Sequence, residues 1–454
     1  MTMPRSGRVP ARGRTALAAL AVPVLLAGAL GSAGPAGAAD PPHRVANPYA
    51  GARVYVNPEW SARAAAEPGG GAVADQPTAI WLDRIAAIEG TDGAMGLRDH
   101  LDAAVAQRAD LVQVTLYNLP SRDCGRPTPQ GELSIDELDR YRTEFIDPIV
   151  EILAAPRYAG LRIVAFVEPN SLPNLVVNTS PRHTATWACD EVRARGTYPD
   201  GIGYALARLG ALPHVYPYLD ISHHGELGWP DNSGPVAALL RQAATTAGST
   251  LANVHGFVAN TANYSVLHEE YFRADTVVNG QPVHQSRWVD WNPFVDEVPY
   301  ARHMRDLLVE EGFAAQASLL VDTSRNGWGG PDRPTGPAAT TGDLNEYVDR
   351  SRIDRRAYIT NWCNQAGSGL GERPAVAPEP GIDAYVWVKP PGESDGADVD
   401  RAWGQPYEPM CDPTYNPWPG GSVRSTGALP DAPPFRQWFP AHFRQLLANA
   451  WPPL

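Results

Sequence analysis

The segments LVQVTLYN at residues 111–118 and LRIVAFVE at 161–168 decide the fold. Both are short and almost uninterruptedly apolar, which is typical of strands buried on both faces of a sheet. Between them, at about 135–154, apolar residues recur with the period of a helix. A strand, a helix and a second strand in this order predict two parallel strands joined by a crossover helix.

The same alternation continues on both sides of this unit. Further strand candidates are TAIWL at 78–82, HVYPYLDI at 214–221, VHGFVAN at 254–260, ASLLVDTS at 317–324 and AYVWVK at 384–389. Further helix candidates lie at about 96–108, 201–211, 234–247, 296–312 and 435–449. No Pro/Ser/Thr-rich linker divides the chain after residue 78. The pattern therefore predicts one α/β domain over 78–454, a TIM-like barrel of parallel strands rather than two open sheets.

The N-terminal region is typical of an exported protein. Residues 1–38 carry four arginines, an apolar run at 15–30 and the small residues Ala36-Gly37-Ala38. This pattern predicts a signal peptide that is cleaved after Ala38, and hence a secreted, extracellular protein. A membrane anchor is disfavoured because the apolar run is short and contains Pro23. Residues 39–77 are predicted to form an extended lead-in to the barrel.

The charge of the chain excludes one class of partner. Lys and Arg total 37 against 50 Asp and Glu, which gives a net charge of −13. A nucleic-acid partner is excluded because phosphate binding needs a basic surface. We also expect no membrane partner, since no later segment is long and apolar enough to span a bilayer.

Four cysteines remain after the predicted cleavage site: Cys124, Cys189, Cys363 and Cys411. An even number of cysteines in an exported protein favours two disulfides. Three pairings are possible, of which the sequential one closes the shortest loops. A zinc site is a poor alternative, because the sequence has no CxxC motif and no short Cys/His spacing.

Polar side chains follow each of the seven predicted strands. Ligands bind at the carboxyl ends of the strands in a parallel barrel, so these residues predict a site there. They are Asp83, Tyr117, Asp123, Glu168, Asn170, Asp220, His223, Asn260, Asn263, Asp322, Arg325, Lys389, Glu393 and Asp395. A single residue of this kind would mean little, because polar residues also cap helices.

Aromatic residues are interleaved with these polar ones: Trp81, Tyr117, Trp229, Trp328, Trp362 and Trp387. Each tryptophan alone is equally consistent with core packing. Together, indole faces, carboxylates and amides favour a neutral sugar ring as ligand, and several carboxylates near one cleft favour acid and base chemistry on a glycosidic bond. A metal pair at His223 and His224 is a minority interpretation, because neighbouring side chains point in different directions.

Nine motifs, in order along the chain, resemble glycoside hydrolase family 6, and especially its bacterial cellobiohydrolase-like members. They are IWLDRI at 80–85, SRDC at 121–124, GEL at 131–133, VEPNSLPNLVVN at 167–178, YLDISHHGELGWP at 218–230, VANTANY at 258–264, DTSRNGWGG at 322–330, WCNQAGSGLGERP at 362–374 and VWVKPPGESDG at 386–396. The resemblance implies a distorted seven-stranded barrel and inverting hydrolysis of β-1,4-glucan chains such as cellulose and cello-oligosaccharides. It also implies that the protein uses no cofactor and no metal, and we expect a monomer.

The resemblance assigns roles to three positions at the cleavage point. Asp123, in SRDC, matches the carboxylate that assists catalysis, and Asp395, in GESDG, matches the proposed base. Asn170 stands where the family has its proton donor, in the sequence EPNSL.

Other positions match substrate contacts or their supports. Trp81 and Asp83 match donor-side sugar contacts, and Tyr117 matches the residue beside the distorted ring. Lys389, the chain's only lysine, and Glu393 match ligands of sugar hydroxyls. The remaining matches are Asp220, His223, Trp229, Asn263 and Trp362. The implied disulfides are Cys124–Cys189 and Cys363–Cys411, which agree with the sequential pairing.

The chain departs from the family pattern at three places. An amide at Asn170 does not protonate a leaving group, and loss of a general acid costs on the order of a hundredfold to ten-thousandfold in rate. Glu168 is the first alternative donor. Glu226 replaces a tryptophan that often stacks an acceptor-side sugar, and GRPTPQ at 125–130 alters the surroundings of Asp123.

Two functional hypotheses follow from these departures. The chain is either a β-1,4-glucan hydrolase of reduced activity or a β-glucan-binding protein that does not turn over its ligand. Long Pro/Gly-rich segments at 326–342, 372–382 and 404–434 are expected to be loops. Loops at 326–350 and 391–412 would roof the cleft and so favour cutting at chain ends.

Overall fold

A computed structural model describes residues 44–91, 93–127, 129–399, 407–417 and 425–454. The predicted signal peptide at 1–38 lies outside these residues. The division of the chain into a lead-in and one barrel domain stays a prediction.

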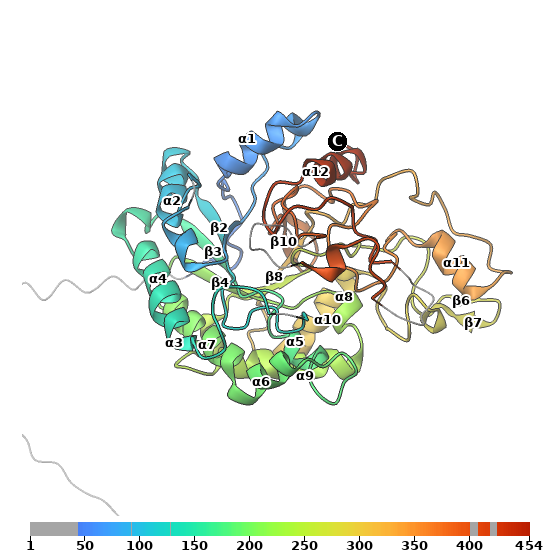
Figure 1. Ribbon diagram of the computed structural model, residues 1–454, viewed down its shortest axis with the longest axis horizontal. Coiled ribbons are helices and arrows are strands. Elements are labelled where there is room, and N and C mark those ends of the chain that lie inside the picture. Colours follow the sequence, from blue (N-terminus) through green and yellow to red (C-terminus); the bar gives the residue numbers. More distant parts are fainter. Residues whose placement is uncertain (1–43, 92, 128, 400–406, 418–424) are drawn as a thin grey trace, which may run out of the picture. The chain divides into compact units, whose positions relative to one another are not determined.

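The main sheet has eight strands in the order β1-β2-β3-β4-β5-β8-β10-β9 (Figure 1). In this order they are β1 (Ile80–Leu82), β2 (Leu111–Leu116), β3 (Arg162–Val167), β4 (Val215–Asp220), β5 (Gly256–Ala259), β8 (Ser318–Asp322), β10 (Ile382–Val386) and β9 (Ala375–Glu379). The first seven strands are paired in parallel, which confirms all seven predicted strands. Only β9 runs antiparallel, to β10.

The segment 372–382 was expected to be a loop, and this expectation is wrong. Instead it contains β9 and the first residue of β10, which form a two-stranded antiparallel extension of the sheet. Two of the five β9 residues are half-buried and the rest are exposed. A strand of this kind is stabilised by its hydrogen bonds to β10 rather than by apolar burial, so its sequence carries no strong strand signal.

The two ends of the parallel sheet approach each other without forming a ladder of described strands. The Ala79 amide, just before β1, donates to the Trp387 carbonyl, just after β10, at 3.1 Å. The Trp81 indole donates to the Val388 carbonyl at 2.8 Å. The sheet is therefore a curled half-barrel whose ends are joined at the site edge.

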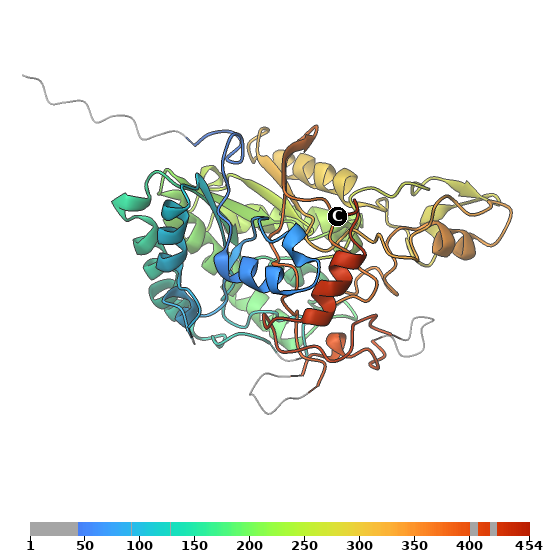
Figure 2. The same cartoon turned by 90° about the horizontal axis from the view of Figure 1, so that it is seen from above.

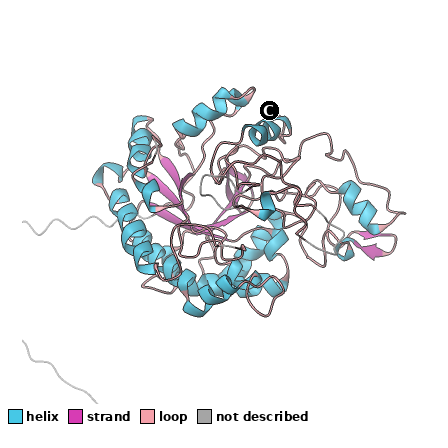
Figure 3. Cartoon of the chain, viewed as in Figure 1, coloured by secondary structure: helices cyan, strands magenta, loops and turns pink. Residues whose placement is uncertain are grey.

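Apolar residues cover both faces of the sheet. The inner cluster includes Trp81, Tyr117, Phe166 and Tyr218. The outer face packs against helices, which surround the strands in Figure 3. The longer ones are α2 (Leu97–Ala106), α4 (Asp147–Leu153), α6 (Trp187–Arg195), α7 (Thr197–Gly210), α9 (Pro230–Ala244) and α10 (Glu297–Glu310), and short ones are α3 (Leu138–Arg140), α5 (Asn174–Val177) and α8 (His224–Leu227).

Two helices from opposite ends of the chain lie side by side (Figure 2). These are α1 (Pro58–Ala66), within the predicted lead-in, and α12 (Pro440–Ala448). The Trp60 ring of α1 contacts the Phe443 ring of α12, with ring centres 6.5 Å apart, and also the Trp387 ring at 6.1 Å. This contact fixes α1 near the carboxyl end of β10.

A smaller unit extends from the barrel and carries β6 (Val277–Val278), β7 (Gln281–Pro282) and α11 (Leu344–Ser351) (Figure 1). It has its own apolar cluster around Phe272, Trp288 and Tyr347. Among the described residues, no helix is long and apolar enough to cross a membrane.

Candidate active site

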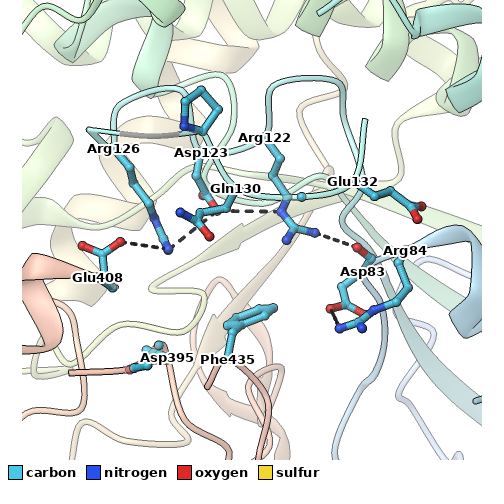
Figure 4. Close-up of a pocket in the computed structure, with 14 residues that line it drawn as sticks. Asp83, Arg84, Arg122, Asp123, Arg126, Gln130, Glu132, Asp395, Glu408 and Phe435 are labelled. Atoms are coloured by element: carbon cyan, nitrogen blue, oxygen red, sulfur yellow. Dashed lines mark hydrogen bonds and ion pairs between the residues drawn. The ribbon is translucent and has the colours of Figure 1, made fainter. Parts of the chain in front are cut away.

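A cavity of about 310 Å³ lies at the carboxyl ends of the strands, where a parallel barrel binds its ligand. Its walls come from loops that follow β1, β2 and β10 (Figure 4). The charged and amide residues that line it are Asp83, Arg84, Arg122, Asp123, Arg126, Gln130, Glu132, Asp395 and Glu408. The structure thus brings the predicted site residues Asp83, Asp123 and Asp395 together.

Asp395 is held as a carboxylate by two cations. Its Oδ2 lies 2.7 Å from Arg325 Nη1 and accepts the Asn364 amide at 2.9 Å, and its Oδ1 lies 3.4 Å from Lys389 Nζ. Burial alone would raise the pKa of Asp395, but Arg325 and Lys389 lower this pKa to about 2. Asp395 is therefore ionised at neutral pH.

Lys389 lies below this carboxylate and is almost completely buried. Its Nζ donates to the Ser394 carbonyl at 3.2 Å and lies 5.0 Å from the centre of the Phe435 ring. Burial lowers the pKa of Lys389, while the charge of Asp395 raises it. The lysine thus acts as a buried counter-ion of Asp395, and its contact with a sugar hydroxyl stays a prediction.

Asp123 lies in a left-handed backbone conformation, with φ of 59°. Its Oδ1 accepts a hydrogen bond from the Tyr117 hydroxyl at 2.5 Å. Its Oδ2 lies 3.7 Å from Arg122 Nε and 3.6 Å from Arg126 Nη2. The two guanidinium groups and the hydroxyl fix this carboxylate in the cavity lining, where it can accept a hydrogen bond from water.

Arg126 connects the two sides of the cavity. Its Nη1 pairs with Glu408 Oε2 at 3.1 Å, across from Asp123 (Figure 4). Its guanidinium carbon also lies 4.5 Å from the ring centre of Trp362, which is a stacking contact. One face of the predicted sugar platform Trp362 is therefore covered by a guanidinium group.

At the other end of the cavity, Asp83 is paired with two arginines. It lies 2.7 Å from Arg436 Nη1 and 2.9 Å from Arg84 Nη2. Burial opposes its ionisation, but Arg436 and Arg84 hold the pKa of Asp83 well below its usual range. Glu393 lies beside the same arginine, with its Oε2 3.6 Å from Arg436 Nε.

The acid position lies outside the lining of this cavity. Asn170 is half-buried and has φ of 57°, and its amide N–H donates to Asp220 Oδ2 at 3.0 Å. Burial raises the pKa of Asp220 to about 7. Asp220 is therefore the carboxyl group that the structure places in direct contact with the backbone of Asn170.

Glu168 is not placed as an alternative proton donor. Its carboxyl group accepts the Asn118 amide at 3.0 Å and the Leu119 amide at 3.3 Å. Burial raises the pKa of Glu168 to about 7, but these contacts hold its oxygens on the backbone after β2. Its described contacts support the loop that leads to Asp123.

The other predicted contacts lie along the β4 and β5 side of the barrel. His223 Nδ1 lies 3.2 Å from Ser265 Oγ, and burial lowers the pKa of this histidine well below its usual value. Asn263 donates to the Thr261 carbonyl at 3.1 Å. The Trp229 indole donates to the Asp290 carbonyl at 2.7 Å and packs against the smaller unit.

The structure shows the surroundings of two of the departures from the family pattern. Glu226 is half-buried and accepts a hydrogen bond from the Ser222 hydroxyl, and burial raises the pKa of Glu226. The segment that carries Arg126 is attached to α6 by the disulfide Cys124–Cys189. The second disulfide is Cys363–Cys411, so both implied pairings are confirmed.

The described residues contain no group of three or more His, Cys, Asp or Glu side chains that could hold a metal. His224 belongs to a buried pair, with its Nδ1 2.6 Å from Glu297 Oε1. The pairing with Glu297 explains this histidine without a metal.

Three residues of the cavity lining were not singled out from the sequence, namely Arg126, Glu408 and Phe435, and neither was Arg436, which pairs with Asp83. Arg325 was noticed only as a polar residue after a strand. Its ion pair with Asp395 joins the loops after β8 and β10. In the sequence, this pairing was indicated only by the position of both residues after neighbouring strands.

Comparison with known proteins places the chain in a family. The family described as "Glycosyl hydrolases family 6" matches residues 45–450. Exoglucanase A of Cellulomonas fimi is 44% identical over 436 residues, which cover 90% of this chain and 49% of that protein. The chain therefore spans about half the length of this relative. 1,4-beta-D-glucan cellobiohydrolase C of Emericella nidulans is 32% identical, over 89% of this chain and 79% of its own.

Solved structures agree with this placement. The catalytic domain of Cellulomonas fimi Cel6B superimposes with a TM-score of 0.85 at 44% identity, covering 91% of this chain and 97% of that domain. Cellobiohydrolase II (Cel6A) of Humicola insolens, in complex with glucose and cellotetraose, gives a TM-score of 0.68 at 29% identity, over 90% of this chain and 100% of that one. This chain belongs to the glycosyl hydrolases family 6.

Proposed function

We propose that this protein is a secreted, inverting β-1,4-glucan hydrolase with a low turnover rate. The observation that supports it is the cavity that holds Asp123 and the ionised Asp395 among sugar-compatible groups. The names of the cellobiohydrolase and exoglucanase relatives support the choice of a glucan as substrate.

The proposed reaction is a single displacement. Water attacks the anomeric carbon and loses its proton to Asp395, or through water to Asp123, while the glycosidic oxygen leaves on the opposite face and takes a proton from solvent water. Asp395 is a weak base because Arg325 and Lys389 stabilise its charge. The leaving oxygen finds an amide at Asn170 instead of an acid, so the departure of this group limits the rate.

The loop at 391–412 supports cutting at chain ends. Its described part is joined to the site edge by the Cys363–Cys411 disulfide and by the Glu408–Arg126 ion pair. A loop held at two points over a cleft restricts access by the middle of a chain. The ratio of soluble to insoluble reducing ends, measured on cellulose film, tests this mode of attack.

The second candidate function is binding of β-glucan without turnover. Two observations favour it: the amide at Asn170, and the guanidinium of Arg126 on the Trp362 ring. The first removes the predicted acid, and the second covers one face of a predicted substrate contact.

The discriminating experiment is restoration of the acid. We expect Asn170→Asp to raise reducing-sugar release from swollen cellulose by about a hundredfold or more, since general acids contribute this much. Asn170→Ala is the matched control, because it removes the amide without adding an acid, and should leave the rate near that of the wild type.

Other results have distinct meanings. If wild type and Asn170→Asp are both inert and cello-oligosaccharides still bind, the binding function replaces the hydrolase. If the wild type is fast and Asn170→Asp brings no gain, another group donates the proton and the proposed cause of the low rate is wrong.

A further inference from the structure

A second cavity, of about 300 Å³, lies next to the first one. Asp83, Arg84 and Phe435 line both cavities, so these side chains form a wall that the two cavities share. The rest of the wall of the second cavity includes residues at α1 and at the start of α2. They are Asn57, Glu59, Trp60, Arg63, Gly90, Thr91, Ala94, Met95 and His100. Neither segment has a role in the reaction described above.

The wall of the second cavity is polar and its charges balance. Glu59 and Glu393 supply carboxylates, and Arg63 and Arg436 supply guanidinium groups. His100 is buried and its Nε2 lies 3.8 Å from Glu59 Oε2. A wall that offers both hydrogen-bond donors and acceptors, with no excess of either charge, favours neutral hydroxyl groups over a phosphate or a metal ion.

His100 adds a neutral hydrogen-bonding group. Its Nδ1 lies 2.9 Å from the Tyr55 hydroxyl, which fixes the orientation of the ring. Burial lowers the pKa of His100 to about 4, so the imidazole is uncharged at neutral pH. Its Nε2 edge is the one that faces Glu59 on the cavity wall.

Two buried atoms of residues that line the second cavity have no partner within 3.5 Å. They are Glu393 Oε2 and Arg436 Nε, which form an ion pair with each other at 3.6 Å. The rest of the Arg436 side chain is fixed by bonds from Nη1 to Asp83 Oδ1 and to the Trp81 carbonyl. Buried polar atoms normally make hydrogen bonds, and this ion pair is long enough for each atom to bond a ligand hydroxyl as well.

We propose that the second cavity is an additional sugar-binding site, which takes the part of a β-glucan chain that extends past Asp83 and Glu393. These two residues are expected donor-side contacts, and the cavity continues from them. The proposal rests on the proposed glucan substrate. It extends the chain-binding path beyond the donor-side contacts, toward α1.

The test fills the second cavity with a larger side chain, introduced at a residue of its lining that is not a predicted substrate contact. Ala87 lines this cavity, whereas its neighbour Ala86 is exposed and lines neither cavity. Binding of cello-oligosaccharides from two to six glucose units is followed by tryptophan fluorescence for wild type, Ala87→Phe and the control Ala86→Phe. Thr91→Trp, at the exposed rim of the same cavity, gives a second obstruction if Ala87→Phe does not fold.

We expect Ala87→Phe to weaken the longest oligosaccharide about tenfold, to the affinity of a shorter one, and to leave the shortest unchanged. Ala86→Phe should match the wild type at every length. The proposal is overturned if the blocked variants bind the longest oligosaccharide as tightly as the wild type, or lose affinity equally at all lengths. A wild type that binds no oligosaccharide would overturn the glucan substrate itself, and the second site with it.

Discussion

The guanidinium of Arg126 occupies one face of Trp362, a predicted substrate contact. The two side chains are in contact, and Glu408 and Asp123 hold the guanidinium in this position. A cation over an indole contributes about 0.5–1 kcal/mol at a partly exposed site. A sugar that stacks on this face of Trp362 must first displace the guanidinium.

We therefore expect Arg126→Ala to increase the affinity for cello-oligosaccharides by roughly two- to fivefold, because about 1 kcal/mol corresponds to a factor of about five. Isothermal titration calorimetry measures the change. Arg333→Ala is the matched control, since Arg333 also pairs with a glutamate, Glu270, and covers an indole, that of Trp451, away from the cavity. A decrease in affinity for Arg126→Ala would show that the guanidinium binds the substrate instead of competing with it.

The sequence predicted the carboxylates of the site better than their cations. Asp83, Asp123 and Asp395 follow strands, and strand ends converge in a barrel. Arg126 and Arg436 lie in loops with no regular spacing, and they reach carboxylates from distant parts of the chain. An irregular loop has no periodic pattern from which the position of a long side chain's charged end can be predicted.

At the level of secondary structure, substitution by alanine should have opposite effects on the free energy of unfolding at two glycines. In β5, a Cβ on Gly256 would lie 2.3 Å from the Ser318 carbonyl oxygen of β8, so Gly256→Ala should lower the free energy of unfolding by about 1–3 kcal/mol. In the turn before β3, Gly160 has nothing within 4 Å of such a Cβ and is not in the left-handed region. There Ala should raise the free energy of unfolding by about 0.4–1 kcal/mol.

Urea unfolding followed by circular dichroism measures both changes. The Gly160→Ala variant controls for any general effect of the substitution on the unfolded chain. A stable Gly256→Ala would mean that β5 and β8 can separate at this point without cost.

The elements that the sequence missed divide into two kinds. Helix α1 had local signals, namely Asn57 at its N-cap and Pro58 at its first position, and these were sufficient to predict it. Strand β9 had none, because AVAPE at 375–379 contains a proline and is mostly exposed. Its existence depends on pairing with β10, which is tertiary information.

Across the whole molecule, buried carboxyl and imidazole groups give opposite dependences of stability on pH. Burial raises the pKa of Glu168 and Asp220 to about 7 and that of Glu269 to about 8. Burial lowers the pKa of His100 and His255 to about 4. Below about pH 6.5 the unfolded histidines bind protons that the folded ones do not, so stability rises with pH there and the carboxyl groups oppose this rise.

Above about pH 6.5 the histidine contribution ends, because unfolded histidines are then neutral as well. The unfolded carboxyls are already ionised, while the folded ones still hold protons, so the folded state binds more protons and stability must fall as pH rises. The fall should continue to about pH 8, where Glu269 ionises. We therefore expect the thermal midpoint of unfolding to decrease between pH 6.5 and 8, by scanning calorimetry at constant ionic strength.

Glu269→Gln isolates one of these carboxyl groups. Its Oε2 accepts the Ile353 amide at 2.8 Å, a contact that a glutamine oxygen preserves, while glutamine cannot ionise. A single buried carboxyl contributes a slope of up to about 1.4 kcal/mol per pH unit, so this variant should show a shallower fall in stability above pH 6.5. Glu270→Gln, at the exposed neighbouring residue paired with Arg333, should keep the wild-type slope. Equal slopes for all three proteins would mean that Glu269 is already ionised in the folded state at pH 6.5.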